Sequence, residues 1–234
     1  MEKLKLVKKN KKSLIIAIDG LGGSGKSLGA RLISKKYKLN LLNSGLCYRF
    51  ASFLIIKNKP RNKISFLKKK FRNLNYKYLN NLNLHTQKIS DYSAIIAKQK
   101  KIRNIIKAFQ KKFSNRYKRI AIEGRDSATK ILNKNPKYDV AFFFKCNLNT
   151  AAYRRWKDLK RSNKHITLKE VKKSLKKRNK LDVSRRFSPL IQTKDSIIIR
   201  TDILSKKTMV KKMSKEIDKK LLKKYGRNFK RRKK

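Results

Sequence analysis

The sequence has little cysteine, proline or glycine, and each shortage excludes a class of protein. Its 234 residues include two cysteines, three prolines and eight glycines. Two cysteines cannot build a disulfide framework or a zinc site, so Cys47 and Cys146 are expected to be core residues in a reducing compartment. No apolar run approaches the roughly 18 residues of a membrane span. We therefore expect one soluble, cytoplasmic globular domain.

Acidic residues are also scarce. The chain has 13 Asp and Glu against 69 Lys and Arg, a formal net charge of +56. A carboxylate in so basic a chain is a candidate for a specific role. Asp19, Glu123, Asp126 and Asp182 stand out, because they lie at predicted strand ends or between arginines. Five other acids are interpreted as surface residues: Glu2, Asp158, Asp195, Glu216 and Asp218.

The large positive charge has two interpretations. Lysine-rich surfaces bind phosphate backbones through counterion release. However, the lysines are spread along the chain together with abundant Asn and Ile, which an AT-rich coding sequence produces without any nucleic-acid partner. Residues 219–234 are the exception, because they form a dense basic tail that we expect to be disordered. Weak, sequence-independent RNA contact is predicted there.

Most glycines gather in one motif. It fits G-x-x-x-x-G-K-[ST] and consists of Gly20, Leu21, Gly22, Gly23, Ser24, Gly25, Lys26 and Ser27. The apolar run 13–19 before it predicts a buried parallel strand, and residues 28–37 after it suit a helix. Strand, loop and helix in this order are the context that a phosphate-binding loop requires.

The residue types in this loop match the chemistry of a nucleoside triphosphate. Glycine lets backbone N–H groups approach phosphate oxygens closely. Lys26 supplies a point charge for the outer phosphates, and the Ser27 hydroxyl suits Mg²⁺. Glu123 ends a later apolar strand and is the predicted acid that holds Mg²⁺ or its water. The loop thus predicts ATP and Mg²⁺ as ligands.

Strand and helix patterns alternate along the chain. We predict strands at 13–19, 39–42, 119–123, 138–146 and 196–200, and helices at 28–37, 46–56 and 90–113. This alternation predicts an α/β fold of three layers with a central parallel sheet. Residues 57–89 look like an insertion on this core, with a weak strand or hairpin pattern at 73–80.

Residues 149–190 form a basic, helical region. Thr167-x-x-Glu170 is a capping-box pattern that predicts a helix start. If that helix continues, Arg178, Asp182 and Arg185 share one face, where two guanidiniums and a carboxylate can bind phosphate and sugar. A solvated salt-bridge stripe is the alternative interpretation.

Several short motifs together resemble the bacterial cytidylate kinases, a branch of the nucleoside monophosphate kinases. They are residues 18–27 (IDGLGGSGKS), 43–49 (NSGLCYR), Glu123-Gly-Arg-Asp126, Arg154-Arg155, and Arg178-x-x-x-Asp182-x-x-Arg185-x-x-x-Pro189-Leu190. The resemblance covers residues 13–205. It implies a P-loop NTPase fold with a monophosphate-binding insertion at 57–89 and an Arg-rich lid at 149–190, in a cytoplasmic monomer.

The resemblance also implies roles for individual residues. Those implied to bind CMP are Ser44, Tyr48, Arg49, Arg103, Arg125, Asp126, Arg178 and Asp182. Lys26, Arg125, Arg154 and Arg185 are implied to act on the transferring phosphoryl group, with Arg155 beside them. The implied reaction is transfer of the ATP γ-phosphate to CMP or dCMP.

The chain departs from the family pattern at three places. Asn43 stands where the family usually has Asp, and Ser127-Ala128 replaces Ile-Gly after the base-reading acid. The helix serine that helps to read cytosine falls at Ala94, with Ser93 beside it. Two alternatives therefore stay open: a P-loop kinase for UMP, AMP or a non-nucleotide acceptor, and a nucleotide-binding protein associated with nucleic acid.

Overall fold

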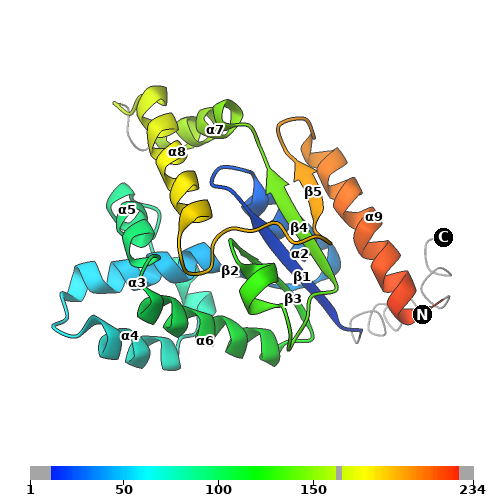
Figure 1. The fold of residues 1–234 in the computed structure, drawn as a ribbon, viewed down its shortest axis with the longest axis horizontal. Helices are drawn as coiled ribbons and strands as arrows, with labels where there is room; N and C mark the ends of the chain where they lie inside the picture. Colours follow the sequence, from blue (N-terminus) through cyan, green and yellow to red (C-terminus); the bar gives the residue numbers. More distant parts are fainter. Residues whose placement is uncertain (1–11, 162–164, 227–234) are drawn as a thin grey trace.

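A five-stranded parallel sheet forms the centre of the molecule (Figure 1). The computed structural model describes residues 12–161 and 165–226. The strands are β1 (Leu14–Gly20), β2 (Asn40–Asn43), β3 (Arg119–Gly124), β4 (Val140–Lys145) and β5 (Ile197–Arg200), in the order β2-β3-β1-β4-β5. All four strand pairings are parallel. The predicted α/β fold with a parallel sheet is confirmed.

Helices cover both faces of this sheet. In chain order they are α2 (Lys26–Tyr37), α3 (Ser44–Asn58), α4 (Lys63–Arg72), the 3₁₀ helix η1 (Tyr76–Asn81), α5 (Gln87–Ile96), α6 (Lys100–Arg116), the short π-helical turn η2 (Ser127–Ile131), α7 (Leu148–Lys160), α8 (Leu168–Ser184) and α9 (Lys206–Tyr225). None of the helices within the described ranges is both long and apolar enough to cross a membrane.

The alternation of side chains along β1 produces two cores. Leu14, Ile16 and Ile18 face one side and pack with residues of α2 and α9, whereas Ala17 faces the other side. On that second side the sheet packs against α3, α4, α6 and η2. Both faces are therefore covered, which explains why the strands are almost continuously apolar.

Strand register brings chemistry-bearing residues to one edge. Ile18 pairs with Glu123, Asp19 with Gly124, and Asn43 with Glu123. Because the strands are parallel, these carboxyl ends meet beside the glycine-rich loop that follows β1. The candidate site therefore lies at this end of the sheet.

Two helix predictions were wrong. The predicted helix at 90–113 is two helices, α5 and α6, because Gln99 takes an extended conformation (φ −81°, ψ 114°) and caps α6. Arg185 does not continue α8: it is the residue after the helix, with φ −66° and ψ 139°. Pro189 follows shortly after, in keeping with a chain that has left the helix.

The weak strand pattern at 73–80 was also misread. That segment contains η1, whose first turn is capped by the Asn75 side chain, which accepts from the Lys77 N–H at 3.1 Å. Leu67, Phe71, Leu79 and Leu84 of the predicted insertion 57–89 are buried in the core that contains α3 and α6. This segment is thus packed into the core.

The carboxyl-terminal prediction needs correction as well. Residues 219–225, expected to be disordered, are the last turns of α9, and Leu221 is buried there. Met209, Met213 and Ile217 of the same helix complete the core over β1 and β4, so the core extends beyond residue 205. Residues 227–234 of the predicted tail lie outside the described residues.

Candidate functional site

The glycine-rich loop joins β1 to α2 and needs glycine for two reasons. Gly23 and Gly25 have φ of 72° and 74°, a conformation that side-chain-bearing residues rarely adopt. At Gly20, an added Cβ would lie 2.4 Å from the Phe144 carbonyl oxygen, so the loop must leave β1 close to β4. The chain thereby exposes successive N–H groups at the start of α2, as an anion site requires.

Lys26 is buried at the beginning of α2. Its Nζ donates to the Leu21 carbonyl oxygen at 3.1 Å and lies 4.0 Å from Glu123 Oε1. The pKa of Lys26 is lowered to about 7, mainly by burial and also by Arg125, while Glu123 opposes the shift. An anionic ligand would stabilise the charged form, so this ammonium suits a site for phosphate.

Ser27 and Glu123, the two residues predicted to hold Mg²⁺, lie next to each other in space. The Ser27 Oγ donates to Glu123 Oε1 at 2.7 Å, while the buried Glu123 Oε2 has no hydrogen-bond partner within the described structure. Nowhere in residues 12–161 and 165–226 do three His, Cys, Asp or Glu side chains gather as a protein-only metal cluster. One hydroxyl and one carboxylate fit Mg²⁺, which usually keeps several waters and takes other ligands from phosphates.

Asp19, another acid singled out from the sequence, has a structural position. Its two oxygens accept from the Ser127 N–H at 2.9 Å and the Ala128 N–H at 2.8 Å. Burial raises the pKa of Asp19 to about 6, although these two hydrogen bonds oppose the rise. Asp19 thus joins the end of β1 to the start of η2. It thereby helps to orient Asp126, the residue just before η2.

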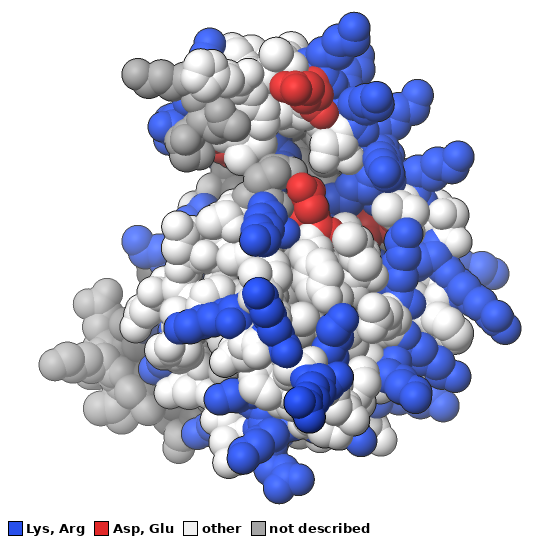
Figure 2. Space-filling view, turned by 90° about the vertical axis from the view of Figure 1, so that its left-hand side faces the viewer, with Lys and Arg blue, Asp and Glu red and all other residues white. Residues whose placement is uncertain are grey.

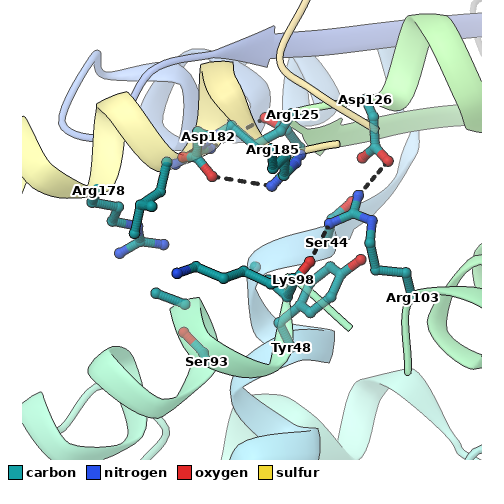
Figure 3. Close-up of a pocket in the computed structure, with 15 residues that line it drawn as sticks. Ser44, Tyr48, Ser93, Lys98, Arg103, Arg125, Asp126, Arg178, Asp182 and Arg185 are labelled. Atoms are coloured by element: carbon teal, nitrogen blue, oxygen red, sulfur yellow. Dashed lines mark hydrogen bonds and ion pairs between the residues drawn. The ribbon is translucent and has the colours of Figure 1, made fainter. Parts of the chain in front are cut away.

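A pocket opens beside the loop, between the tip of β3 and helices α3, α5, α6 and α8 (Figure 3). Two ion pairs cross its wall. Arg125 Nε donates to Asp182 Oδ2 at 2.7 Å, and Arg103 Nη2 donates to Asp126 Oδ2 at 2.5 Å. Asp182 also accepts from Arg185 Nη1 at 3.1 Å. Carboxylates of the pocket are therefore held by guanidiniums from distant segments.

Positive charge accumulates at the end of this pocket nearest the loop. Burial lowers the pKa of Arg178 to about 10, with Arg125 adding to the effect, and burial lowers that of Arg49 to about 10, with Arg155 and Arg125 adding. Asp182 and Glu123 offset this repulsion only in part. Buried guanidiniums that disfavour one another's charge create a site that an anion would stabilise.

The opposite end of the pocket combines an aromatic ring with the Arg103–Asp126 ion pair. The Arg103 guanidinium lies 5.4 Å from the centre of the Tyr48 ring, and the buried Ser93 of α5 also lines the pocket. Ser44, the first residue of α3, accepts through its Oγ from Gln110 Nε2 at 2.7 Å. Such a surface, with paired donors and acceptors beside an aromatic ring, suits a planar heterocycle.

The structure brings together almost all residues predicted for the acceptor site. The pocket is lined by Ser44, Tyr48, Arg103, Arg125, Asp126, Arg178, Asp182 and Arg185. Arg49 is not among the lining residues; its charge lowers the pKa of Arg178, which does line the pocket. Arg154 does not line it: its Nη2 donates to the Thr201 carbonyl oxygen at 2.7 Å, and the Thr201 hydroxyl donates to the Ser24 carbonyl oxygen at 2.9 Å.

The departures from the family pattern have structural counterparts. Asn43 caps α3 through its Oδ1, which accepts from the Leu46 N–H at 3.2 Å, so this position keeps a capping role without the charge. Ala128 N–H binds Asp19 in a turn that does not require glycine. Ser93 and Ala94 both line the pocket, so a serine is present on this turn of α5.

Three site residues were missed by sequence reasoning. Asn179 of α8 accepts the Gly22 N–H through its Oδ1 at 2.9 Å, where a phosphate oxygen would bind. Lys98, in the break between α5 and α6, extends into the pocket (Figure 3). His85 contacts Arg49 through Nδ1. Asn179 directly follows Arg178, so its position near the site could have been predicted from the sequence. The positions of Lys98 and His85 depend on how the chain reverses direction, which no local sequence pattern indicates.

Fold and site together define a P-loop enzyme of the nucleoside monophosphate kinase class. A family model described as cytidylate kinase matches residues 16–219. A cytidylate kinase of Mesomycoplasma hyopneumoniae (strain 7448) is 32% identical over 222 residues, covering 90% of this chain and 96% of that protein. One of Fusobacterium nucleatum is 30% identical over 218 residues, covering 88% and 98%. The chain belongs to the cytidylate kinase family.

A solved structure agrees with the fold. An uncharacterized protein from Eubacterium ventriosum ATCC 27560 superposes with a TM-score of 0.53 at 22% identity, covering 89% of this chain and 99% of that one. At this identity the likeness concerns architecture alone. The family resemblance inferred from the short motifs is confirmed.

Proposed function

We propose that the protein transfers the γ-phosphoryl group of ATP to CMP and dCMP, giving ADP with CDP or dCDP. The observation that carries this proposal is the junction of two sites: a phosphate loop with a buried lysine, and a pocket containing arginines and a buried Arg103–Asp126 pair. Phosphoryl transfer needs in-line positioning and charge neutralisation rather than a protein nucleophile.

The donor would bind at the loop formed by residues 20–27. Its phosphate oxygens would accept from loop N–H groups, replacing Asn179 Oδ1 at Gly22, and from the Lys26 ammonium. Ser27 and Glu123 would hold Mg²⁺, which when bound neutralises charge on the phosphates of the donor. Arg154 stays next to this loop through Thr201, so its charge is available on the donor side.

The phosphate of the acceptor would occupy the cationic end of the pocket. Arg49, Arg125 and Arg178 carry the charges there, and a bound phosphate would relieve the repulsion that lowers the pKa values of Arg49 and Arg178. Asp182 orients Arg125 and Arg185 and suits the sugar hydroxyls as an acceptor. Ser44 supplies a further hydroxyl at the start of α3.

The base would lie against Tyr48, beside the Arg103–Asp126 pair. Cytosine presents an acceptor at N3 and a donor at N4, so a guanidinium and a carboxylate complement both groups. Uracil presents the reverse pattern, a donor at N3 and an acceptor at O4, and would leave Asp126 facing an oxygen. A buried polar pair left unsatisfied discriminates strongly against the wrong ligand.

The experiment that tests the proposal measures ADP formation from Mg-ATP with CMP, dCMP, UMP, AMP and no acceptor. Wild type should prefer CMP and dCMP. Asp126→Ala should lose that preference, with kcat/KM for CMP falling by roughly 10²-fold or more. Asp158→Asn, which changes an exposed acid of α7, is the matched control and should behave as wild type.

Turnover with another acceptor would keep the chemistry and overturn the base assignment. Absence of turnover with every acceptor would overturn the kinase proposal and favour a nucleotide-binding protein associated with nucleic acid. RNA contact by the basic carboxyl terminus and a monomeric state stay predictions. Truncation after Gly226 tests the first without removing the buried Leu221 of α9, and sedimentation tests the second.

A further inference from the structure

A second cavity shares Arg103, Asp126 and Tyr48 with the acceptor pocket but is otherwise lined by different residues. Its remaining wall comes from α6, from η2 and from the segment that follows α8. The Arg103–Asp126 pair therefore separates two cavities. None of the roles proposed above uses the second one.

The spacing of residues on α6 directs positive charge into this cavity. Lys100, Arg103, Asn104 and Lys107 follow the i, i+3, i+4, i+7 pattern of one helix face, and all four line the cavity. Two further cations come from elsewhere in the chain: Lys130 from η2, and Arg186 from the segment after α8. Cations from three separate segments of the chain thus converge on one space.

This positive charge is not balanced by protein. Within the described part of the chain, Asp126 is the one acid in the lining, and it is already paired with Arg103 at 2.5 Å. Burial lowers the pKa of Lys107, and Lys111 and Lys130 lower it further. The Nε of Arg103, which is 5% exposed, has no hydrogen-bond partner in the described structure.

The far wall of the cavity is ordered by cation–ring contacts. The Lys100 Nζ lies 5.2 Å from the centre of the Phe187 ring, and the Arg186 guanidinium lies 5.6 Å from the same centre. Ser188 next to it has a φ of 53°, a conformation that is rare for serine and that turns the chain along the cavity. Two of the cations, Lys100 and Arg186, thus contact the same aromatic ring at this wall.

We propose that this second cavity is a binding site for an oligophosphate anion. Lys100, Lys107, Lys130 and Arg186 would contact successive phosphates, and the Asn104 amide and Ser188 hydroxyl would add hydrogen bonds. Because the cations come from three elements around one cavity, they can contact several phosphates of one ligand, whereas a ligand with a single carboxylate would leave most of them without an anionic partner. On the face that Figure 2 shows, Lys and Arg side chains are scattered.

The shared wall couples the two cavities. An oligophosphate in the second cavity offers Arg103 a second anionic partner and weakens its pairing with Asp126. If that pair reads the acceptor base, as proposed above, the ligand raises the Kd for CMP, and CMP raises the Kd for the ligand by the same factor. This coupling rests on the proposed function, whereas binding itself does not.

Isothermal titration calorimetry with inorganic pyrophosphate tests the site at fixed ionic strength, with ADP present in excess to fill the donor loop. The test variant is Lys107→Gln with Lys130→Gln. The control is Lys101→Gln with Lys112→Gln, which removes the same charge from exposed positions of α6 outside the cavity. We expect the test variant to bind pyrophosphate at least tenfold more weakly and the control to stay within twofold of wild type.

Equal weakening in both variants would overturn the proposal, because it would reflect net charge alone. Unchanged affinity in the test variant, or no binding to wild type, would overturn it as well. Thermal unfolding of both variants confirms that they are folded. Parallel titrations with inorganic triphosphate and guanosine triphosphate distinguish the source: tighter binding of the nucleotide indicates a nucleotide ligand, and equal or weaker binding indicates a free oligophosphate.

Discussion

Replacing Asp182 by Asn removes the carboxylate that pairs with two arginines of the site, Arg125 and Arg185. Asp182 accepts from Arg125 at 2.7 Å and from Arg185 at 3.1 Å, and its side chain is 14% exposed. Removing one partner of a buried ion pair costs about 3–5 kcal/mol. Asn keeps the shape and one acceptor oxygen, and the site is partly solvated. We therefore expect the free energy of unfolding to fall by about 2–4 kcal/mol.

Urea unfolding of the ligand-free protein measures this loss, again with Asp158→Asn as the control. Phosphate should partly rescue the variant, because it neutralises guanidiniums that Asp182 no longer balances. Inorganic phosphate at about 10 mM should stabilise Asp182→Asn more than it stabilises wild type at equal ionic strength. A variant as stable as the control, or one that phosphate does not rescue, would refute the assignment of Asp182 as the counterion of this cluster.

The pH dependence supplies an independent check. Burial favours a raised pKa for Asp182, but Arg125, Arg185 and Arg178 outweigh it, and the pKa lies below its ordinary value. A lowered pKa means that the ionised carboxylate stabilises the folded state above the unfolded pKa of about 3.9, and that this stability is lost as pH falls through the lower folded value. The difference between wild type and Asp182→Asn should therefore shrink below about pH 4.

Three further predictions concern residues outside that cluster. Because the pKa of Lys26 is about 7 in the free protein, ADP binding at pH 8 should take up close to ~1 proton, measured calorimetrically in buffers of different ionisation enthalpy, and Lys26→Met should abolish this uptake. Gly29→Ala should lower the free energy of unfolding by about 1–3 kcal/mol in thermal unfolding, because the new Cβ would lie 2.5 Å from the buried ring of Phe144. Ala favours helix more than Gly does, so a gain in stability would show that this contact is not strained. The pKa of Asp19 is raised to about 6, so its protonated form contributes stability that is present below its unfolded pKa and is lost as pH rises through 6. The free energy of unfolding should therefore fall less between pH 4 and 6 in Asp19→Asn than in wild type.

Local patterns predicted the sheet and the donor loop well. The phosphate loop is readable because its N–H groups must be close together in sequence, so the glycines that expose them lie within one short segment. Strands β1, β3 and β4 are apolar runs buried on both faces. The capping box at Thr167 and Glu170 is present as predicted, since it depends on four adjacent residues.

Failures arose where the outcome depends on distant contacts. Gln99 interrupts the apolar pattern of 90–113 without Gly or Pro, and the break appears only when α5 packs on α3 and α6 packs on α4. Residues 219–225 are highly charged, yet they remain helical because α9 covers the sheet and buries Leu221. Arg185 leaves α8 so that its Nε can donate to the Ser188 carbonyl oxygen at 2.5 Å.

By itself, the sequence determined the P-loop, its Lys26 and Ser27, the acid at the tip of β3 and the membership of a kinase family, because each depends on short segments of fixed order. The tertiary structure alone decided which charges meet. Arg103 and Asp126 pair across 23 positions and Arg125 and Asp182 across 57, while Asn179 reaches Gly22 across 157. Such partners are chosen by the packing of helices on the parallel sheet, since burial makes an unpaired charge costly and no local periodicity records where its counterion lies.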